Sequence, residues 1–318
     1  MHELQMDREL MRIPGLHLQW DADMTSHTWM KTRSRAALLI HVESPKALIK
    51  LTQLCARKGY PMLILGGGSN TVFARSFFDG IVVKLSGMSF MQKEVVAPNV
   101  VRVGASVKLT DLLSYSRNSG MMGLEFCTMI PGNVGGALAG NAGAGNWGVC
   151  DFVDRVLVLS RDGDLYDVYR NEYRYSYRHS QLAGGIILEA DFRLMPINKQ
   201  LSRQNSMDFA GKKKNQPYKI PNAGCIFKNP LDPKTGQKVS AGKLIDEAGL
   251  KKYKVNGIEV SDQHANFIIN PGNGSGEDFL AVMRTIQDRV YDRFQIELEV
   301  EARIVGNSNE DLTNCVLC

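Results

Sequence analysis

The stretch PMLILGGGSN, residues 61–70, places a short apolar run directly before three consecutive glycines. An apolar run of this length that ends in glycine is typical of a buried strand followed by a tight loop. Glycine accepts the backbone angles that let successive N–H groups converge on one anion, so the loop is suited to holding a phosphate group. The loop lacks the lysine and hydroxyl residue of a P-loop, which argues against Mg²⁺-dependent nucleotide hydrolysis.

The residues before this loop predict a strand–helix–strand unit. Residues 36–42 are apolar apart from one histidine and predict a buried strand. Ser44 and Pro45 supply the cap and first residue of a helix that we expect to run to about Arg57, with Gly59 as its stop.

A second glycine-rich stretch, IPGNVGGALAGNAGAG, occupies residues 130–145. Its glycine spacing does not match the dinucleotide-binding fingerprint. Either glycine loop alone could be a structural turn, but two of them favour a site for a phosphate-bearing cofactor. A helix is expected from about Leu109 to Ser119, among short strands at residues 81–85, 100–104, 156–159 and 186–192.

The later part of the chain predicts a further domain. Residues 195–220 are polar and basic and predict a linker, with the domain beginning near Pro217. Ser240 caps an expected helix through Ala248, and Ser275 with Asp278 opens a longer one. Residues 296–304 alternate apolar and charged and predict a strand, on which the carboxylates at 297, 299 and 301 are equivalent and exposed.

Composition limits the possible classes. The 318 residues favour two or three subdomains, and the formal net charge of +5 is spread along the chain rather than massed as in nucleic-acid-binding proteins. One basic run, residues 212–214, is either a solvated loop or a diphosphate contact. No apolar run approaches the ~18 residues of a membrane span, and no signal peptide is recognised, so we expect a cytoplasmic protein.

Cysteine usage agrees with a reducing compartment. The six cysteines are scattered and are expected to be free thiols. Cys315 and Cys318 form a lone C-x-x-C without a second pair or a nearby histidine, so we expect no metal site.

Seven segments, in one order along roughly residues 27–306, resemble the UDP-N-acetylenolpyruvoylglucosamine reductase family. They are residues 64–70, 130–137 with 141–144, 177–180, 223–230, 241–246, 264–270 and 298–303. The resemblance implies an α+β fold: a two-subdomain FAD-binding fold of the vanillyl-alcohol-oxidase/PCMH type with a C-terminal α+β substrate-binding domain. The implied parts are an N-terminal extension (1–20), FAD-binding subdomains 1 (21–87) and 2 (88–200), the substrate-binding domain (201–306) and a tail (307–318).

The resemblance also implies the reaction. NADPH reduces a noncovalently bound FAD, which then reduces UDP-N-acetylglucosamine enolpyruvate to UDP-N-acetylmuramate for peptidoglycan. Hydride passes from flavin N5 to C3 of the enolpyruvyl group, and a proton reaches C2. We expect a monomer that binds neither nucleic acid nor membrane.

Three catalytic residues follow from the resemblance. Arg178 would face the substrate carboxylate, and Glu301 would complete the polar cluster. Cys225 stands where the family commonly has serine, and would donate the proton to C2. A nearby Arg178 or Lys228 would stabilise its thiolate, so substrate reduction is expected to decline at alkaline pH.

The remaining site residues also rest on the resemblance. The chain lacks the extra tyrosine loop that one subclass carries after the Tyr-Arg-x-Ser segment, so diphosphate contacts must come from elsewhere, with Lys213 or Lys214 as candidates. Expected substrate contacts are Tyr177, Lys213, Lys228 and Asn229. Expected FAD contacts are Gly66, Gly67, Gly68, Ser69, Asn70, Ile130, Pro131, Gly132, Val134, Gly135, Asn141 and Gly143.

Alternatives remain at this point. The chain could be another flavin oxidoreductase on the same cofactor fold. The motif around Cys225 argues against this, because it belongs to the pattern of the substrate domain and not to flavin binding. A non-enzymatic nucleotide-sugar or nucleic-acid binding protein would be colourless, and no aromatic and basic motif supports it. His264 is a structural histidine before a buried strand or, less favoured, a base.

Overall fold

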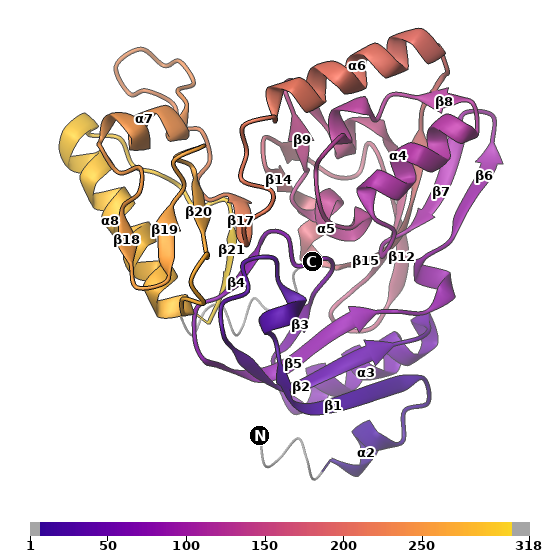
Figure 1. Cartoon of the computed structure of the whole chain (residues 1–318). Coiled ribbons are helices and arrows are strands. Elements are labelled where there is room, and N and C mark those ends of the chain that lie inside the picture. The colour runs from indigo at the N-terminus through magenta and orange to yellow at the C-terminus, as the bar shows by residue number, and fades with distance from the viewer. Residues whose placement is uncertain (1–6, 307–318) are drawn as a thin grey trace.

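The computed structural model describes residues 7–306, which fold into three parts (Figure 1). The predicted tail, with Cys315 and Cys318, lies outside the described residues, as do residues 1–6. No helix among the described residues is long and apolar enough to cross a membrane.

The first part contains the predicted strand–helix–strand unit. Its sheet has the order β1 (Leu16–Asp23), β2 (Arg35–Val42), β5 (Phe77–Leu85) and β3 (Met62–Ile64), in which the last three strands are parallel. Helix α3 (Pro45–Lys58) packs on one face, and α2 (Arg8–Met11) lies beside it. The sheet begins at Leu16, inside the stretch predicted as an extension, because the partly buried β1 pairs with β2.

The ends of α3 confirm the cap signals. The Ser44 side chain accepts a hydrogen bond from the Ala47 N–H at 3.2 Å, and Gly59 adopts a φ of 69° at the carboxyl end. The chain then turns directly into β3 and the glycine loop.

The second part is a five-stranded antiparallel sheet. Its order is β12 (Leu165–Tyr169), β11 (Val153–Leu159), β15 (Ile186–Arg193), β7 (Val100–Gly104) and β6 (Lys93–Ala97). Helices α4 (Leu109–Asn118) and α5 (Val134–Ala139) share a core with one face of this sheet. Shorter strands are β8 (Met121–Met122), β9 (Gly143–Ala144), β10 (Trp147–Gly148), β13 (Tyr175–Ser176), β14 (His179–Ser180) and β16 (Met195–Pro196).

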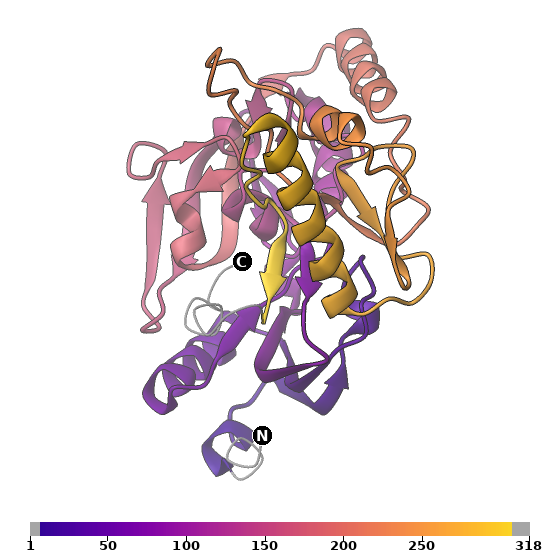
Figure 2. The same cartoon turned by 90° about the vertical axis from the view of Figure 1, so that its left-hand side faces the viewer.

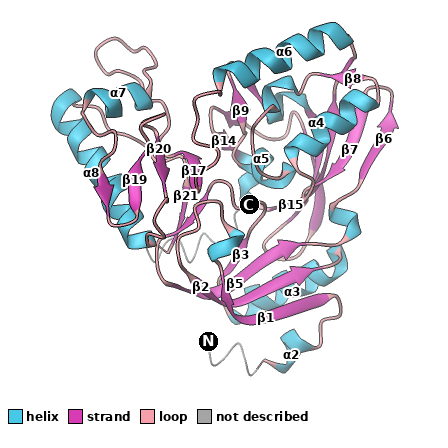
Figure 3. Cartoon of the chain, viewed as in Figure 1, coloured by secondary structure: helices cyan, strands magenta, loops and turns pink. Residues whose placement is uncertain are grey.

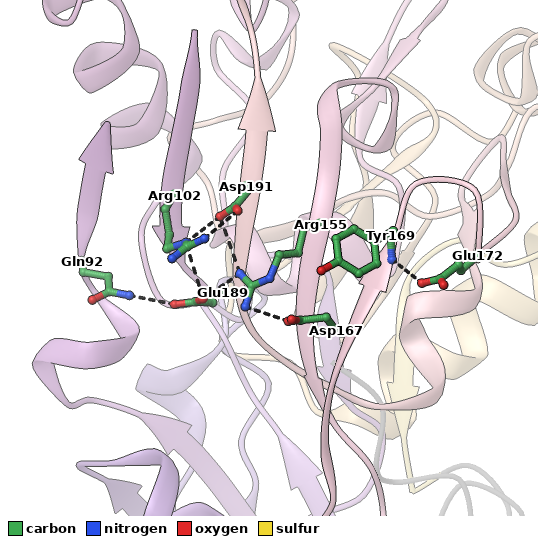
Figure 4. A network of polar contacts seen from close by, with 8 residues as sticks. All are labelled: Gln92, Arg102, Arg155, Asp167, Tyr169, Glu172, Glu189 and Asp191. Carbon is green, nitrogen blue, oxygen red and sulfur yellow. Dashed lines mark hydrogen bonds and ion pairs between the residues drawn. The ribbon is translucent and has the colours of Figure 1, made fainter. Parts of the chain in front are cut away.

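The other face of this sheet carries a network of ion pairs (Figure 4). Asp191 accepts two hydrogen bonds from Arg102, each of 2.8 Å. Arg155 on the next strand reaches Glu189 at 2.9 Å and Asp167 at 2.7 Å. Charges of opposite sign on neighbouring strands stabilise the register of the sheet.

Helix α6 (Lys199–Lys212) replaces most of the linker predicted at residues 195–220, so that prediction is wrong. Asn198 caps the helix, and the buried Ser202 hydroxyl donates to Glu125 at 2.6 Å, in the short 3₁₀ helix η3 (Glu125–Cys127). Polar contacts rather than an apolar stripe hold α6, so its sequence lacked helical periodicity.

The third part packs two helices against a four-stranded sheet. The sheet order is β17 (Asn222–Cys225), β20 (Phe267–Ile269), β19 (Ile258–Val260) and β18 (Lys254–Val255). Helix α7 (Ala241–Glu247) begins after Ser240, and α8 (Gly276–Phe294) begins with a capping box of Ser275 and Asp278, which confirms both predicted starts. Figure 3 shows these helices on the outer side of the sheet.

The strand predicted at residues 296–304 is only partly formed. Burial alternates from Ile296 to Ala302, but the regular strand β21 covers only Arg303–Val305. It pairs in parallel with β4 (Thr71–Phe73), which directly follows the glycine loop (Figure 2). This pairing joins the third part to the first.

Candidate active site

Arg178 lies at the tip of a tight hairpin formed by β13 and β14. Ser176 pairs with His179, so Tyr177 and Arg178 alone make the turn, and Arg178 has a φ of 56°. A positive φ is uncommon for a residue other than glycine, and such residues cluster at functional sites.

The Arg178 guanidinium is held on two sides. Its Nε donates to Glu301 Oε1 at 2.5 Å, and its Nη2 donates to the Gly143 carbonyl at 3.0 Å. The exposed fractions of the two side chains are 24% for Arg178 and 16% for Glu301. Burial raises the pKa of Glu301 despite the opposing effect of Arg178. By contrast, Glu299 is 71% exposed, so the predicted equivalence of the two carboxylates is wrong.

Cys225 ends β17 after an irregularity in the strand pairing. The register between β17 and β20 shifts between Asn222 and Cys225, and Gly224 has a φ of 77°. The Asn222 side chain accepts from the Gly224 N–H at 2.9 Å and so fixes this bend. Burial first, and then Glu301, raise the pKa of Cys225 to about 12, while Arg178 acts in the opposite direction.

Glu301 is the point where the three parts of the molecule meet. Its N–H donates to the Ile226 carbonyl at 2.7 Å, next to Cys225. Its own carbonyl accepts from the Asn70 side chain at 3.2 Å, and the Arg303 N–H donates to the Asn70 carbonyl at 2.8 Å. The glycine loop is therefore tied to the same strand segment that carries the Glu301 carboxylate.

The two glycine-rich stretches approach each other closely. A Cβ on Gly67 would lie 3.2 Å from the Gly132 Cα, and one on Gly132 would lie 2.8 Å from the Ser69 hydroxyl oxygen. Gly68 has a φ of 65°, and its Cβ would lie 2.2 Å from the His27 carbonyl oxygen. At Gly68 the backbone contact and the left-handed φ together require glycine, while the approach of Gly67 to Gly132 is tight. Across the described residues, the N–H groups of residues 66–70 have no hydrogen-bond partner, which leaves them free for an anion.

Comparison with known proteins decides the family. The chain is 38% identical over 288 residues to a UDP-N-acetylenolpyruvoylglucosamine reductase of Geobacter metallireducens, which covers 90% of this chain and 93% of the relative. The chain belongs to the UDP-N-acetylenolpyruvoylglucosamine reductase family.

Further comparisons agree. The corresponding reductase of Limosilactobacillus fermentum is 31% identical over 96% of this chain and all of the relative. A crystal structure of the Thermus caldophilus reductase aligns with a TM-score of 0.77 at 30% identity, covering 91% of this chain and 98% of that one. Family models match for an FAD binding domain at residues 36–169 and for the C-terminal domain of UDP-N-acetylenolpyruvoylglucosamine reductase at residues 216–305. The predicted family and its α+β FAD-binding fold are confirmed, and the chain is an FAD-dependent oxidoreductase.

Residues 66–70 together with Gly132 form what we call the glycine cradle. This cradle fits the FAD of a UDP-N-acetylenolpyruvoylglucosamine reductase. Consecutive free N–H groups and the absence of side chains between residues 66–68 and 132 suit the diphosphate of such a cofactor. The resemblance also nominated Val134 and Gly135, but their N–H groups donate to the carbonyls of Val107 and Ala105. Their N–H groups are therefore engaged within the protein.

Two more residues nominated for FAD, Asn141 and Gly143, contact the hairpin of Arg178. The Asn141 side chain donates to the Ser176 carbonyl at 2.8 Å and accepts from the Cys150 N–H at 3.2 Å. The Gly143 carbonyl receives Arg178 itself. Both contact the hairpin that carries Arg178. Ile130 and Pro131 lie in the second glycine segment, directly before Gly132.

Lys213 lies close to the second glycine segment. Its ammonium donates to the carbonyls of Phe126 at 3.3 Å and Thr128 at 2.5 Å. Burial, with a smaller effect from Arg178, lowers the pKa of Lys213 to about 8. This placement supports Lys213, rather than the exposed Lys214, as the functional member of the basic run.

The other substrate candidates are partly engaged within the protein. Lys228 pairs with Glu299 at 2.5 Å, and Asn229 accepts from the Ala241 N–H at 3.0 Å. Tyr177 faces Lys238, whose ammonium lies 3.0 Å from the centre of the ring. Sequence reasoning missed Lys238 because the contact joins two parts of the molecule that are distant in the chain.

His264 is engaged within its own turn. His264 Nδ1 accepts from the Asn266 N–H at 3.2 Å, and the ring packs against Phe267, which supports a structural role. Within residues 7–306 no group of three or more His, Cys, Asp or Glu side chains could hold a metal ion.

Proposed function

We propose that this reductase converts UDP-N-acetylglucosamine enolpyruvate to UDP-N-acetylmuramate, with Arg178, Glu301 and Cys225 as its catalytic residues. The observation that carries the proposal is the convergence of these three side chains, each from a different segment, beside the glycine cradle. The proposal extends to the cytosolic step of peptidoglycan synthesis and to a monomeric enzyme.

The chemistry divides between cofactor and protein. The glycine-rich loops would hold FAD, and the bound cofactor, once reduced by NADPH, would supply hydride chemistry at C3 of the enolpyruvyl group. Negative charge then develops on the substrate carboxylate and C2, and the Arg178 guanidinium stabilises it with donors that Glu301 and Gly143 hold in a fixed plane.

The Cys225 thiol completes the reaction by giving its proton to C2. A thiol is a stronger acid than a serine hydroxyl, so it suits the role that serine has elsewhere in the family. Its environment keeps the proton in place, because the pKa of about 12 leaves it protonated at neutral pH. The alkaline decline expected from the sequence is therefore revised: burial and Glu301 outweigh Arg178, and loss of the proton needs a pH near 12.

Lys213 is our candidate for the substrate diphosphate, and Tyr177 and Lys228 border the same region. Support comes from the hydrogen bond of Lys213 to the Thr128 carbonyl, just before the second glycine segment, and from the electrostatic effect of Arg178 on its pKa. The two carbonyl oxygens accept hydrogen bonds from the Lys213 ammonium but carry no full negative charge. A phosphate would supply that charge and would offset the cost of burying the ammonium.

An anaerobic absorbance experiment tests the proposed function. NADPH should bleach the yellow protein, and UDP-N-acetylglucosamine enolpyruvate should then restore the colour. The variant Arg178→Met should bleach normally and regain its colour at least about 100-fold more slowly. Bleaching without recovery in the unmodified protein would discard the substrate, and a colourless protein that FAD cannot reconstitute would discard the cofactor as well.

A further inference from the structure

Three basic side chains lie in a row across the sheet of the first part. The register pairs His17 with His41 and His41 with Lys84, so one base from each of β1, β2 and β5 stands side by side. On these strands Leu38, Ile40, Ile81 and Val83 share a core with α3. The three bases alternate with these residues and thus lie on the opposite face.

This row is at the carboxyl ends of the parallel strands. The next strand is β3, where the Leu65 N–H donates to the Val83 carbonyl at 2.8 Å immediately before the three glycines. Lys84 on β5 therefore lies on the strand next to β3, close to the point where the glycine loop begins. Ligands of open sheets with parallel strands bind in the crevice outside these carboxyl ends.

Residues of the other FAD-binding part lie against the same ends of the strands. The Ser106 hydroxyl donates to the Leu85 carbonyl at 2.7 Å, and Asn133 lies against Gly67. His27 comes from the loop that encloses Gly68, and it is close enough to Lys84 and His41 for their charges to lower its pKa, after the larger effect of burial.

Two bases of this row, Lys84 and His41, have no directly paired acid, and the nearby His27 has only the electrostatic effect of Asp23, which acts to raise its pKa. His17 pairs with Glu43 at 2.6 Å. Across residues 7–306, the side chains of Lys84, His41 and His27 have no hydrogen bond or ion pair. Lys84 is largely buried, and its pKa is lowered by that burial. Placing an unpaired ammonium beside two imidazoles costs stability, which an anionic ligand would offset.

We propose that Lys84, flanked by His41 and His27, binds a phosphate group of FAD from the sheet face opposite α3. The site would combine two sources of positive potential: backbone N–H groups from the glycine loop and side chains from the strand ends. The inference rests on the assignment of FAD as the cofactor and is independent of the substrate and of the residues that transfer the proton.

The test measures FAD affinity without turnover. Apoprotein is prepared by removing FAD, and FAD is titrated back while flavin fluorescence is followed. In low salt, Lys84→Met should weaken FAD binding by about tenfold or more, and Lys84→Arg should recover most of the affinity. Lys50→Met, on the exposed side of α3, is the matched control and should bind like the unmodified protein.

The salt dependence of FAD binding shows whether the effect of Lys84→Met is electrostatic or comes from altered packing. The deficit of Lys84→Met should shrink in concentrated salt, where screening acts over only about 3 Å. His41→Gln keeps the ammonium and should show a smaller deficit, which provides a second measurement if Lys84→Met folds poorly by circular dichroism. Unchanged FAD affinity in Lys84→Met, a deficit independent of salt, or an effect confined to the KM for NADPH would each overturn the proposal.

Discussion

At the residue scale, the chemistry of Cys225 depends on its surroundings more than on its identity. The thiol is enclosed between the bend at Gly224 and the Arg178–Glu301 pair. Burial and the neighbouring carboxylate favour the neutral form, while the guanidinium favours the thiolate. The neutral form prevails, so the side chain can act as an acid without further activation.

Replacing Cys225 should affect only the second half of the reaction. In Cys225→Ala, reduction by NADPH should be unchanged and reoxidation by the enolpyruvyl sugar at least about 100-fold slower, whereas Cys225→Ser should retain activity. Because the pKa of the thiol is about 12, its contribution to the reoxidation rate should stay constant up to about pH 10. Stopped-flow absorbance would measure both steps, and a normal reoxidation rate in Cys225→Ala would exclude the thiol as donor.

Lys213 should introduce a pH dependence in ligand binding. Its pKa of about 8 means that the ammonium is charged below pH 8 and loses its charge above it. The KM for the enolpyruvyl sugar should therefore rise as the pH passes through about 8, while Lys213→Met should have a high KM at every pH. The exposed neighbour substitution Lys214→Met is the control, and parallel pH profiles for all three proteins would contradict the role.

Sequence reasoning nominated candidate site residues but could not rank them. The glycine loops, Cys225 and Arg178 stand in local motifs, which short-range patterns can reveal. Glu301 differs from Glu299 only in what each meets in space: Arg178 for the first and solvent with Lys228 for the second. Periodicity contains no information about such partners, so the resemblance, not the pattern, singled out Glu301.

At the element scale, the predictions succeeded where apolar periodicity and caps marked a helix and failed where polar contacts hold it. Helices α3 and α8 have both signals, and their starts were predicted. Helix α6 has neither an apolar stripe nor a stop signal, and it depends on Ser202 meeting Glu125. The partner lies far away in the chain, which explains why the segment resembled a linker.

Gly68 should tolerate no side chain. In Gly68→Ala the new Cβ would meet the His27 carbonyl and would need a left-handed backbone, so we expect a loss of at least about 1–3 kcal/mol and poor FAD retention. Gly211→Ala, in α6 with open space around it, should be neutral or stabilising by up to about 1 kcal/mol. Urea unfolding and the flavin content would be measured, and equal behaviour of the two variants would contradict this account.

The ion network should stabilise the second sheet unevenly. Asp191 is 7% exposed and accepts two bonds from Arg102, so Asp191→Asn should cost about 1–3 kcal/mol. Asp154→Asn, on the same sheet, removes a pair with Arg193 whose side chain is 62% exposed, and should cost less than about 1 kcal/mol. Denaturant unfolding of both variants measures the two losses in unfolding free energy. Asp191→Asn should lose more than Asp154→Asn in both low and high salt.

At the scale of the whole molecule, the cofactor should act as a structural bridge. The cradle takes residues 66–70 from one part and Gly132 from another, so FAD binds the folded arrangement and not the unfolded chain. With free FAD at 100 times its Kd, the folded state should gain about 3 kcal/mol. Calorimetry should show a higher Tm for the FAD-loaded protein, and no such shift for Gly68→Ala; an equal Tm with and without FAD would disprove the bridging role.

The parallel pairing of β4 with β21 has a consequence for the order of events during synthesis. Strand β4 emerges from the ribosome early, while its partner and Glu301 are still untranslated. At elongation rates of about 5–20 residues per second, the glycine loop waits many seconds for the strand that anchors Asn70. The first two parts can collapse during this interval, but a nascent chain that ends before residue 301 lacks the Arg178–Glu301 pair and the anchor of the glycine loop.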